Sequence, residues 1–217
     1  METRTRFKPD PISDLIATGQ LATTGPICIL GLDCGYGAPG LSVVNVTSGS
    51  MLGLEFLYGE CIQTERSEDR QSVAYDDCMR ISAIGRWLRQ QHDRWTPDIV
   101  VMEIPFSGAR GAMAIKGMAF ATALSISVAD SYFKCKVLQL CSPYDTKKWC
   151  TGNTKAEKEE MIRAAQSYFP DVPWPMQVKN KKKMDLKKSE AIADSLAAIL
   201  TFLRLPPKNA PVRNRVL

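Results

Sequence analysis

Two apolar runs in the sequence each end in an acidic residue. Asp33 follows ICILGL, and Glu103 follows DIVVM. An apolar strand does not need a terminal carboxylate for its stability, whereas the ligands of α/β sheets gather at the carboxyl ends of strands. If the two runs are neighbouring parallel strands, these acids lie side by side and repel each other unless a cation or a proton joins them. Taken singly, each acid is equally well explained as the cap of a loop.

A second pair of acids lies near the C-terminus. Glu190 and Asp194 are four residues apart and therefore share one face of a predicted helix. Their neighbours on that face are mainly alanines, which suits close approach to another surface; a solvated helix face is the competing interpretation. If that surface carries Asp33 and Glu103, four carboxylates converge, and oxygen ligands without His or Cys are typical of Mg²⁺ or Mn²⁺. Paired ions of this kind support phosphodiester hydrolysis.

The elements that must position these acids follow from periodicity and turn residues. The predicted strands span 27–33, 41–46, 52–57, 98–103 and 136–141. The predicted helices span 70–91, 109–132, 154–169 and 189–204, the third opened by a capping box from Thr154 to Glu157. This order predicts an α/β fold with a five-stranded mixed sheet, three antiparallel strands followed by two parallel ones, and helices on both faces.

The chain divides into a flexible N-terminal arm, one domain and a tail. We assign residues 1–25 to the arm, 26–205 to the domain and 206–217 to the tail. Within the domain, residues 170–188 combine prolines with a run of lysines and are predicted to form a mobile basic loop.

Charge is distributed unevenly along the 217 residues. Residues 1–133 carry 11 basic and 15 acidic groups, whereas residues 134–217 carry 17 basic and 8 acidic groups. A basic half on a globular domain indicates a polyanionic partner such as nucleic acid, although a solvated lysine face explains the same charge.

The composition excludes other classes. The chain is 45% hydrophobic and 24% charged, as in globular proteins. The longest apolar run, residues 117–129, is too short to cross a membrane uninterrupted, so no membrane partner is expected. The seven cysteines lack a CxxC pair and the chain has one histidine, which disfavours a zinc site. We expect a reducing, cytoplasmic location, which is the host cytoplasm if a phage encodes the protein.

Four stretches in the same order resemble the RuvC-type Holliday-junction resolvases of the ribonuclease H-like fold. They are ILGLDCGYGAPGLSVV at 29–44, IVVMEIPFSGARG at 99–111, SPYDTKKWCTGNTKAEKEEMI at 142–162 and SEAIADSLAAIL at 189–200. The resemblance implies a metal-dependent endonuclease that cuts four-way DNA junctions symmetrically. It also implies two Mg²⁺ ions for each active site, replaceable by Mn²⁺, a homodimer, and no small-molecule cofactor.

The resemblance assigns metal-binding roles to the acids. Asp33 and Glu103 match the first two metal-binding acids and Asp194 matches the last. The family usually has its third acid where this chain has Ala191, so Glu190 takes that role here, with Asp185 as a remote substitute.

The resemblance also assigns residues to the DNA. Lys147 and Lys158 match catalytic lysines that would neutralise phosphate charge, with Lys148 and Lys155 close by. Phe106 would insert between bases, and Arg110 would contact a phosphate. The basic loop would grip a DNA arm without reading its sequence; its candidate contacts are Lys179, Lys181, Lys182, Lys183, Lys187 and Lys188.

Three alternatives remain at this point. The same acids would serve a nuclease for flap or branched DNA, or for RNA–DNA hybrids. The DCGYG turn at 33–37 is also typical of a phosphate-binding loop in nucleotide phosphotransferases, but the chain has little room for their second domain. The third alternative is a non-catalytic junction-binding module, against which the intact acids argue.

Overall fold

Five strands form one mixed sheet at the centre of the protein. The computed structural model describes residues 11–21, 25–47, 53–65, 72–104, 111–175 and 184–203. The strands are β1 (Ile27–Asp33), β2 (Gly40–Thr47), β3 (Gly53–Cys61), β4 (Ile99–Glu103) and β5 (Val137–Cys141). They lie in the order β3-β2-β1-β4-β5, antiparallel from β3 to β1 and parallel from β1 to β5. The predicted fold class is confirmed.

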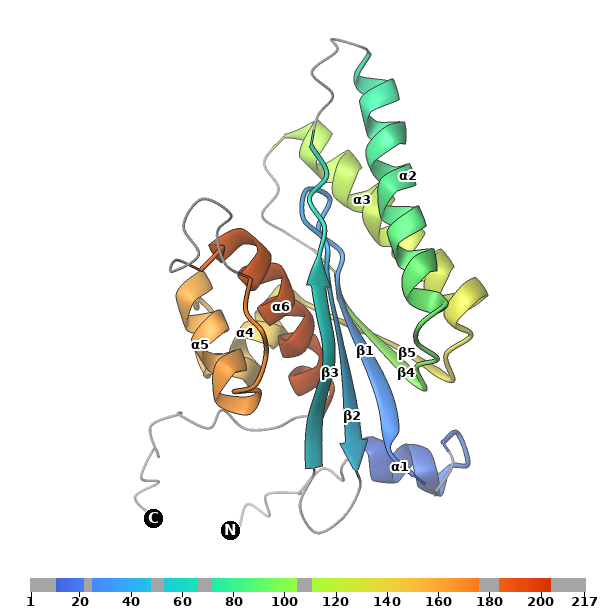
Figure 1. The fold of residues 1–217 in the computed structure, drawn as a ribbon, viewed down its shortest axis with the longest axis vertical. Helices are drawn as coiled ribbons and strands as arrows, with labels where there is room; N and C mark the ends of the chain where they lie inside the picture. Colours follow the sequence, from blue (N-terminus) through green and yellow to red (C-terminus); the bar gives the residue numbers. More distant parts are fainter. Residues whose placement is uncertain are drawn as a thin grey trace, which may run out of the picture.

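Helices cover both faces of the sheet. They are α1 (Pro11–Ala17), α2 (Val73–His92), α3 (Ala112–Val128), α4 (Pro143–Thr151), α5 (Lys158–Tyr168) and α6 (Leu186–Leu203). A π-helical turn, Ala129–Phe133, continues α3. Figure 1 shows α2 and α3 on one side of the sheet and α4, α5 and α6 on the other. Strand β1 contributes side chains to the cores on both faces of the sheet, since Ile29 packs on the α6 side and Leu30 and Leu32 pack on the α2–α3 side.

The backbone of α6 lies almost in contact with the sheet. Gly31 in β1 faces the carbonyl of Ser195, and Gly40 in β2 faces the carbonyl of Ala191; a β-carbon at either glycine would overlap that oxygen. The Ser42 and Ser195 hydroxyls, 2.6 Å apart, add a buried hydrogen bond across this contact. The two sheet glycines therefore permit the close approach of α6, and the helix residues that meet them, Ala191 and Ser195, are themselves small.

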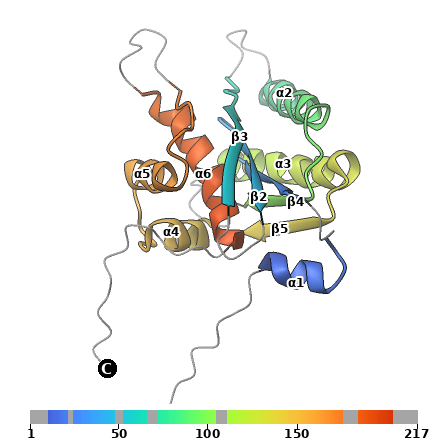
Figure 2. The same cartoon turned by 60° about the horizontal axis from the view of Figure 1, so that its bottom comes forward.

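The prediction of a flexible arm over residues 1–25 is wrong for the part that the structure describes. Residues 11–17 form α1, and the side chains of Ile12 and Leu21 are buried in the core. Figure 2 shows α1 beside β5, at the edge of the sheet. Burial of these apolar side chains stabilises a segment that its prolines and glycines had marked as loose.

Two helices also differ from the prediction. Helix α4 lies between the predicted strand at 136–141 and the predicted helix at 154–169, where the sequence predicts no helix; Ser142 caps it and Pro143 occupies its first turn. Helix α5 is capped by Glu157 and not by Thr154, because Glu157 and Glu160 form the reciprocal capping box. The Asn153 side chain accepts a hydrogen bond from the Lys155 N–H at 3.0 Å, which keeps that stretch in a turn.

The predicted basic loop is shorter than 170–188. Val172 is buried, and the Asp185 N–H donates to the Pro175 carbonyl at 2.8 Å. Because α6 begins at Leu186, Lys187 and Lys188 are helical. Residues 176–183 and the predicted tail, 206–217, lie outside the described residues.

The segment Ala112–Phe133 is long and apolar enough to cross a membrane, and only 28% of its most apolar window is buried. The sequence argument missed this because it required an uninterrupted apolar run. One such helix is weak evidence for a membrane span. Ala121, Ser125 and Val128 of α3 are buried in the protein, so part of its apolar surface packs on the domain.

Substitution of Gly31 by alanine tests the close contact of α6. The added methyl group must displace the α6 backbone, so Gly31→Ala should lower the free energy of unfolding by about 1–3 kcal/mol. Gly53→Ala is the matched control, because a β-carbon there meets only Thr47 at an ordinary 3.6 Å. Urea unfolding of both variants measures the effect; equal stabilities would contradict the described contact.

Candidate active site

The four predicted acids converge where α6 crosses the ends of β1 and β4. Asp33 and Glu103 are paired neighbours in the parallel register of these strands. Gly31 and Gly40 let α6 approach, and the negative charges of Glu190 and Asp194 then act on the same site. Each of the four side chains is partly exposed, so a ligand can reach them from solvent.

The electrostatics of the cluster show how closely the acids interact. Burial raises the pKa of Asp33 well above its usual range, and the charges of Glu103 and Glu190 raise it further. Burial also raises the pKa of Asp194, with added repulsion from Asp33, Glu103 and Glu190. Burial also raises the pKa of Glu103, although a hydrogen bond from Thr146 and the charge of Lys147 oppose the rise. The neighbouring lysines therefore do not fully neutralise the negative charge of the four acids, since the pKa values of Asp33 and Asp194 remain raised.

Two of the predicted lysines lie beside this cluster. Lys147, in α4, lowers the pKa values of Glu103 and Asp194 through its charge. Lys158, at the start of α5, forms an ion pair with Glu190, Nζ to Oε2 at 2.5 Å. This contact is the main cause of a raised pKa for Lys158. The structure therefore brings both lysines to the acids.

The chemistry of the donors fits a divalent cation. The acids supply carboxylate oxygens, which Mg²⁺ and Mn²⁺ prefer. A cation between them would offset both the burial of charge and the mutual repulsion that raise the pKa values of Asp33 and Asp194. Among the described residues, no three His, Cys, Asp or Glu side chains are already arranged to hold a metal ion. The Glu190 carboxylate is turned toward Lys158, so it must reorient to join the other three.

Ala191, which stands where the family usually has its third acid, has no room for a longer side chain. It is 3% exposed, and its backbone and side chain both lie against Gly40. Glu190, one residue earlier, is partly exposed, and its charge acts on Asp33 while its carboxylate pairs with Lys158. Asp185 precedes α6 and receives the Lys188 N–H at 3.2 Å, so it serves as a helix cap.

Several predicted DNA contacts have defined positions. Lys148 and Lys155 are exposed near α4 and α5. Lys187 and Lys188 lie in the first turn of α6. Burial and the charge of Asp33 raise the pKa of the Cys61 thiol, at the end of β3, and the charges of these two lysines oppose the rise. The remaining candidates lie outside the described residues: Phe106, Arg110, Lys179, Lys181, Lys182 and Lys183.

Sequence reasoning missed Thr146. Its side chain is fully buried, and its hydroxyl donates to Oε2 of Glu103 at 2.5 Å. The helix-start signature Ser142-Pro143 could have revealed α4 and with it the proximity of Thr146 to Glu103.

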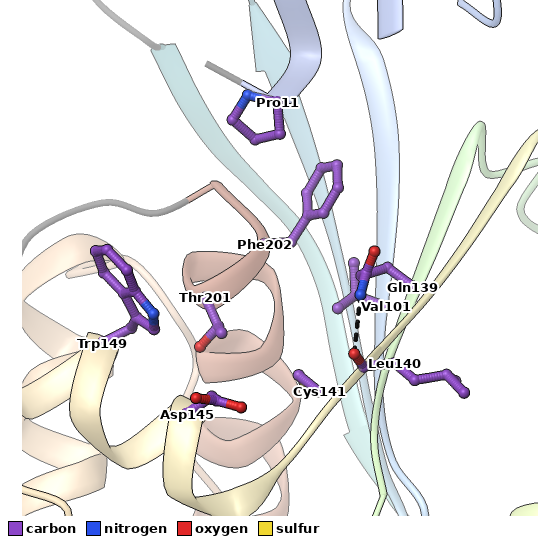
Figure 3. A pocket seen from close by; sticks show the side chains of 9 residues that line it. All are labelled: Pro11, Val101, Gln139, Leu140, Cys141, Asp145, Trp149, Thr201 and Phe202. Carbon is purple, nitrogen blue, oxygen red and sulfur yellow. Dashed lines mark hydrogen bonds between the residues drawn. The ribbon is translucent and has the colours of Figure 1, made fainter. Parts of the chain in front are cut away.

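A pocket of about 240 Å³ lies away from the acids, between α4, α6 and β5. Figure 3 shows Trp149 and Asp145 from α4 and Phe202 from α6 lining it, with Pro11 of α1 at its rim. Among the described residues that line it, only Asp145 carries charge, and Asp145 accepts a hydrogen bond from Ser142. This pocket is not the candidate active site.

Comparison with solved structures places the fold among the ribonuclease H-like proteins. A Thermus thermophilus RuvC structure matches with a TM-score of 0.57 and 22% identity, over 81% of this chain and 92% of that chain. The structure of T. thermophilus RuvC in complex with a Holliday junction substrate matches with a TM-score of 0.59 and 20% identity, again over 81% of this chain and 92% of that chain. The yeast mitochondrial Holliday junction resolvase Ydc2 matches with a TM-score of 0.51 and 14% identity, over 81% of this chain and 77% of that chain.

The sequence itself matches the family described as crossover junction endodeoxyribonuclease RuvC, over residues 29–169. The chain belongs to this family. Asp33, Glu103, Lys147 and Lys158 lie within the matched region, whereas α6 with its two acids lies beyond it. No curated protein sequence matches the chain significantly.

Neutralising one acid should stabilise the protein when metal is chelated. Asp33 has a raised pKa in the folded state, so its charge opposes folding increasingly as the pH rises above its ordinary value of 3.8. In EDTA, Asp33→Asn should therefore raise the Tm by about 2–4 °C for each kcal/mol of repulsion removed, and the gain should be larger at pH 8 than at pH 4.

Thermal unfolding of wild type and variant at both pH values measures this gain. Asp171→Asn, the same change at an exposed carboxylate, should leave the Tm nearly unchanged. A lower Tm for Asp33→Asn at pH 8 would contradict the described repulsion.

Proposed function

We propose that this protein is a metal-dependent endonuclease that resolves four-way DNA junctions by paired, symmetric phosphodiester hydrolysis. The observation that carries the proposal is the convergence of Asp33, Glu103 and Asp194, with Glu190 beside them, in a member of the crossover junction endodeoxyribonuclease family. The acids are the residues that a non-catalytic module would not need.

The four carboxylates would hold two Mg²⁺ ions, for which Mn²⁺ can substitute. Bound there, the ions supply an activated water and stabilise the leaving oxygen. The strand register places Asp33 beside Glu103, and the contact of α6 with the sheet brings Asp194 to the same region. The three side chains would then close around the metal as it binds, since they do not form a ready ligand set among the described residues. Glu190 exchanges its ion pair with Lys158 for the metal site.

The lysines around the acids would carry the DNA phosphates. Lys147 and Lys158 lie closest to the cluster and would neutralise charge on the scissile phosphate. Three further lysines are exposed and would bind the DNA backbone on either side of the scissile phosphate. They are Lys148, Lys155 and Lys187. Contacts to phosphate confer affinity and salt dependence but no sequence preference.

Branched DNA is the favoured substrate because of the family and its structural neighbours. One matched structure is a T. thermophilus RuvC with a Holliday junction substrate, and another is named a Holliday junction resolvase. A flap or hybrid nuclease of the same fold would use the same acids, so a panel of substrates separates these functions. We propose a cytoplasmic location, with which seven free cysteines agree.

A homodimer would present two active sites to the two-fold symmetric junction. The outer surface of α2 and α3 is the candidate interface, because large apolar side chains there are 45–56% exposed. They are Val73, Tyr75 and Met79 on α2, and Met113, Ile115 and Phe120 on α3. Burial of this surface against a second copy would remove it from water.

Cleavage of synthetic junctions tests the proposed function. In Mg²⁺, the wild type should nick a four-way junction at symmetric positions and leave linear duplex intact. Asp33→Asn and Asp194→Asn should each cut at least about 100-fold more slowly, because a metal ligand is lost, while still binding the junction in Ca²⁺. Asp171→Asn should cut like the wild type.

Equal cutting of flaps, hybrids and junctions would replace resolution with a general nuclease activity. Tight junction binding without cleavage in either Mg²⁺ or Mn²⁺ would contradict the nuclease proposal and support a non-catalytic junction-binding module.

Sedimentation velocity tests the dimer. Phe120→Glu and Ile115→Glu place a charge in the proposed interface and should convert dimer to monomer, with a loss of at least about tenfold in dimer affinity. Tyr144→Glu is the matched control, because Tyr144 is also exposed but lies on α4, across the sheet. Dissociation by the control variant alone would contradict the assigned face.

A further inference from the structure

The buried hydroxyl of Thr146 lies against one of the metal-binding acids. Its Oγ1 is 2.5 Å from Oε2 of Glu103, and the whole residue has no solvent-exposed surface. The separation in sequence is 43 residues, so the contact depends on tertiary structure and not on local turn geometry.

The path of the chain explains how Thr146 comes to lie there. Glu103 is paired with Cys141 at the ends of β4 and β5, and the Ile104 N–H donates to the Cys141 carbonyl at 2.9 Å. Helix α4 begins immediately afterwards, with the Ser142 hydroxyl capping its first turn. One turn into that helix, the residue beside Glu103 is Thr146.

The hydroxyl is not required by α4 itself. Oγ1 also lies 3.1 Å from the Pro143 carbonyl, but a hydroxyl has one proton to donate, and the contact with Glu103, at 2.5 Å, is the shorter of the two. Valine has a similar helix propensity and would fill the same buried space without a polar atom. The contact with the carboxylate is what a hydroxyl adds at this position.

We propose that Thr146 is a positioning residue, whose hydroxyl fixes the rotation of the Glu103 carboxylate and thereby sets the affinity of the site for divalent metal. A carboxylate that accepts a hydrogen bond at one oxygen cannot rotate freely, so its other oxygen has a defined direction. Residues that orient metal ligands in this way commonly contribute about 10–100-fold to metal affinity. The inference rests on the proposed function, since it assumes that Glu103 binds metal.

The test is a titration of the full chain with Mn²⁺ alone, without DNA, followed by calorimetry. Thr146→Val should weaken Mn²⁺ binding by about 10-fold or more, whereas Thr146→Ser, which keeps the hydroxyl, should remain within about 3-fold of the wild type. Thr201→Val is the matched control, because the Thr201 hydroxyl donates to the Ala197 carbonyl of its own helix at 2.7 Å and not to one of the four acids. The Mg²⁺ concentration for half-maximal junction cleavage should shift by the same factor for Thr146→Val.

The outcomes separate this inference from the proposed function. Equal Mn²⁺ affinity for Thr146→Val and the wild type would overturn the role of Thr146 and leave the nuclease intact. A wild type that binds no Mn²⁺ would overturn both. If the Tm shows that Thr146→Val is unfolded, Thr146→Ala removes the same hydroxyl with a smaller side chain, and its affinity relative to Thr146→Ser decides.

Discussion

The architecture of the site depends on how closely one helix approaches the sheet. Gly31 and Gly40 have no side chain on the face that α6 covers, so the helix backbone lies against the strands at Ala191 and Ser195. No larger residue fits at either glycine without moving the helix. Because of this contact, Asp194 lies among the acids at the strand ends, and not one side-chain layer above them.

The cost of this arrangement is electrostatic. Four carboxylates share a small, partly buried region, where burial and then their mutual repulsion raise the pKa values of Asp33 and Asp194. The neighbouring elements offset part of the repulsion, with Lys147 from α4 and Lys158 from α5. The same lysines that moderate the acids are placed to meet phosphate, so one charge distribution would serve both metal and DNA.

Sequence reasoning recovered the parts of the site that local patterns encode. The apolar runs ending in Asp33 and Glu103 predicted both strands and their pairing, and the small residues around Asp194 predicted the close approach of α6. It failed where tertiary contacts decide. Ile12 is buried in the core although prolines and glycines surround it in the sequence. Thr146 lies beside Glu103 because residues 143–151 form a helix, which the sequence pattern did not predict. The exposed apolar surface of α2 and α3 became visible only in three dimensions, because its periodicity is that of any core helix.

The central claim is that acids from β1, β4 and α6 form one metal site. Anomalous diffraction from crystals of the protein grown with Mn²⁺ tests it most directly. The account predicts manganese peaks bounded by the carboxylates of Asp33, Glu103 and Asp194, with Glu190 released from Lys158. Manganese bound elsewhere, with these three acids free of metal at saturating concentration, would contradict it.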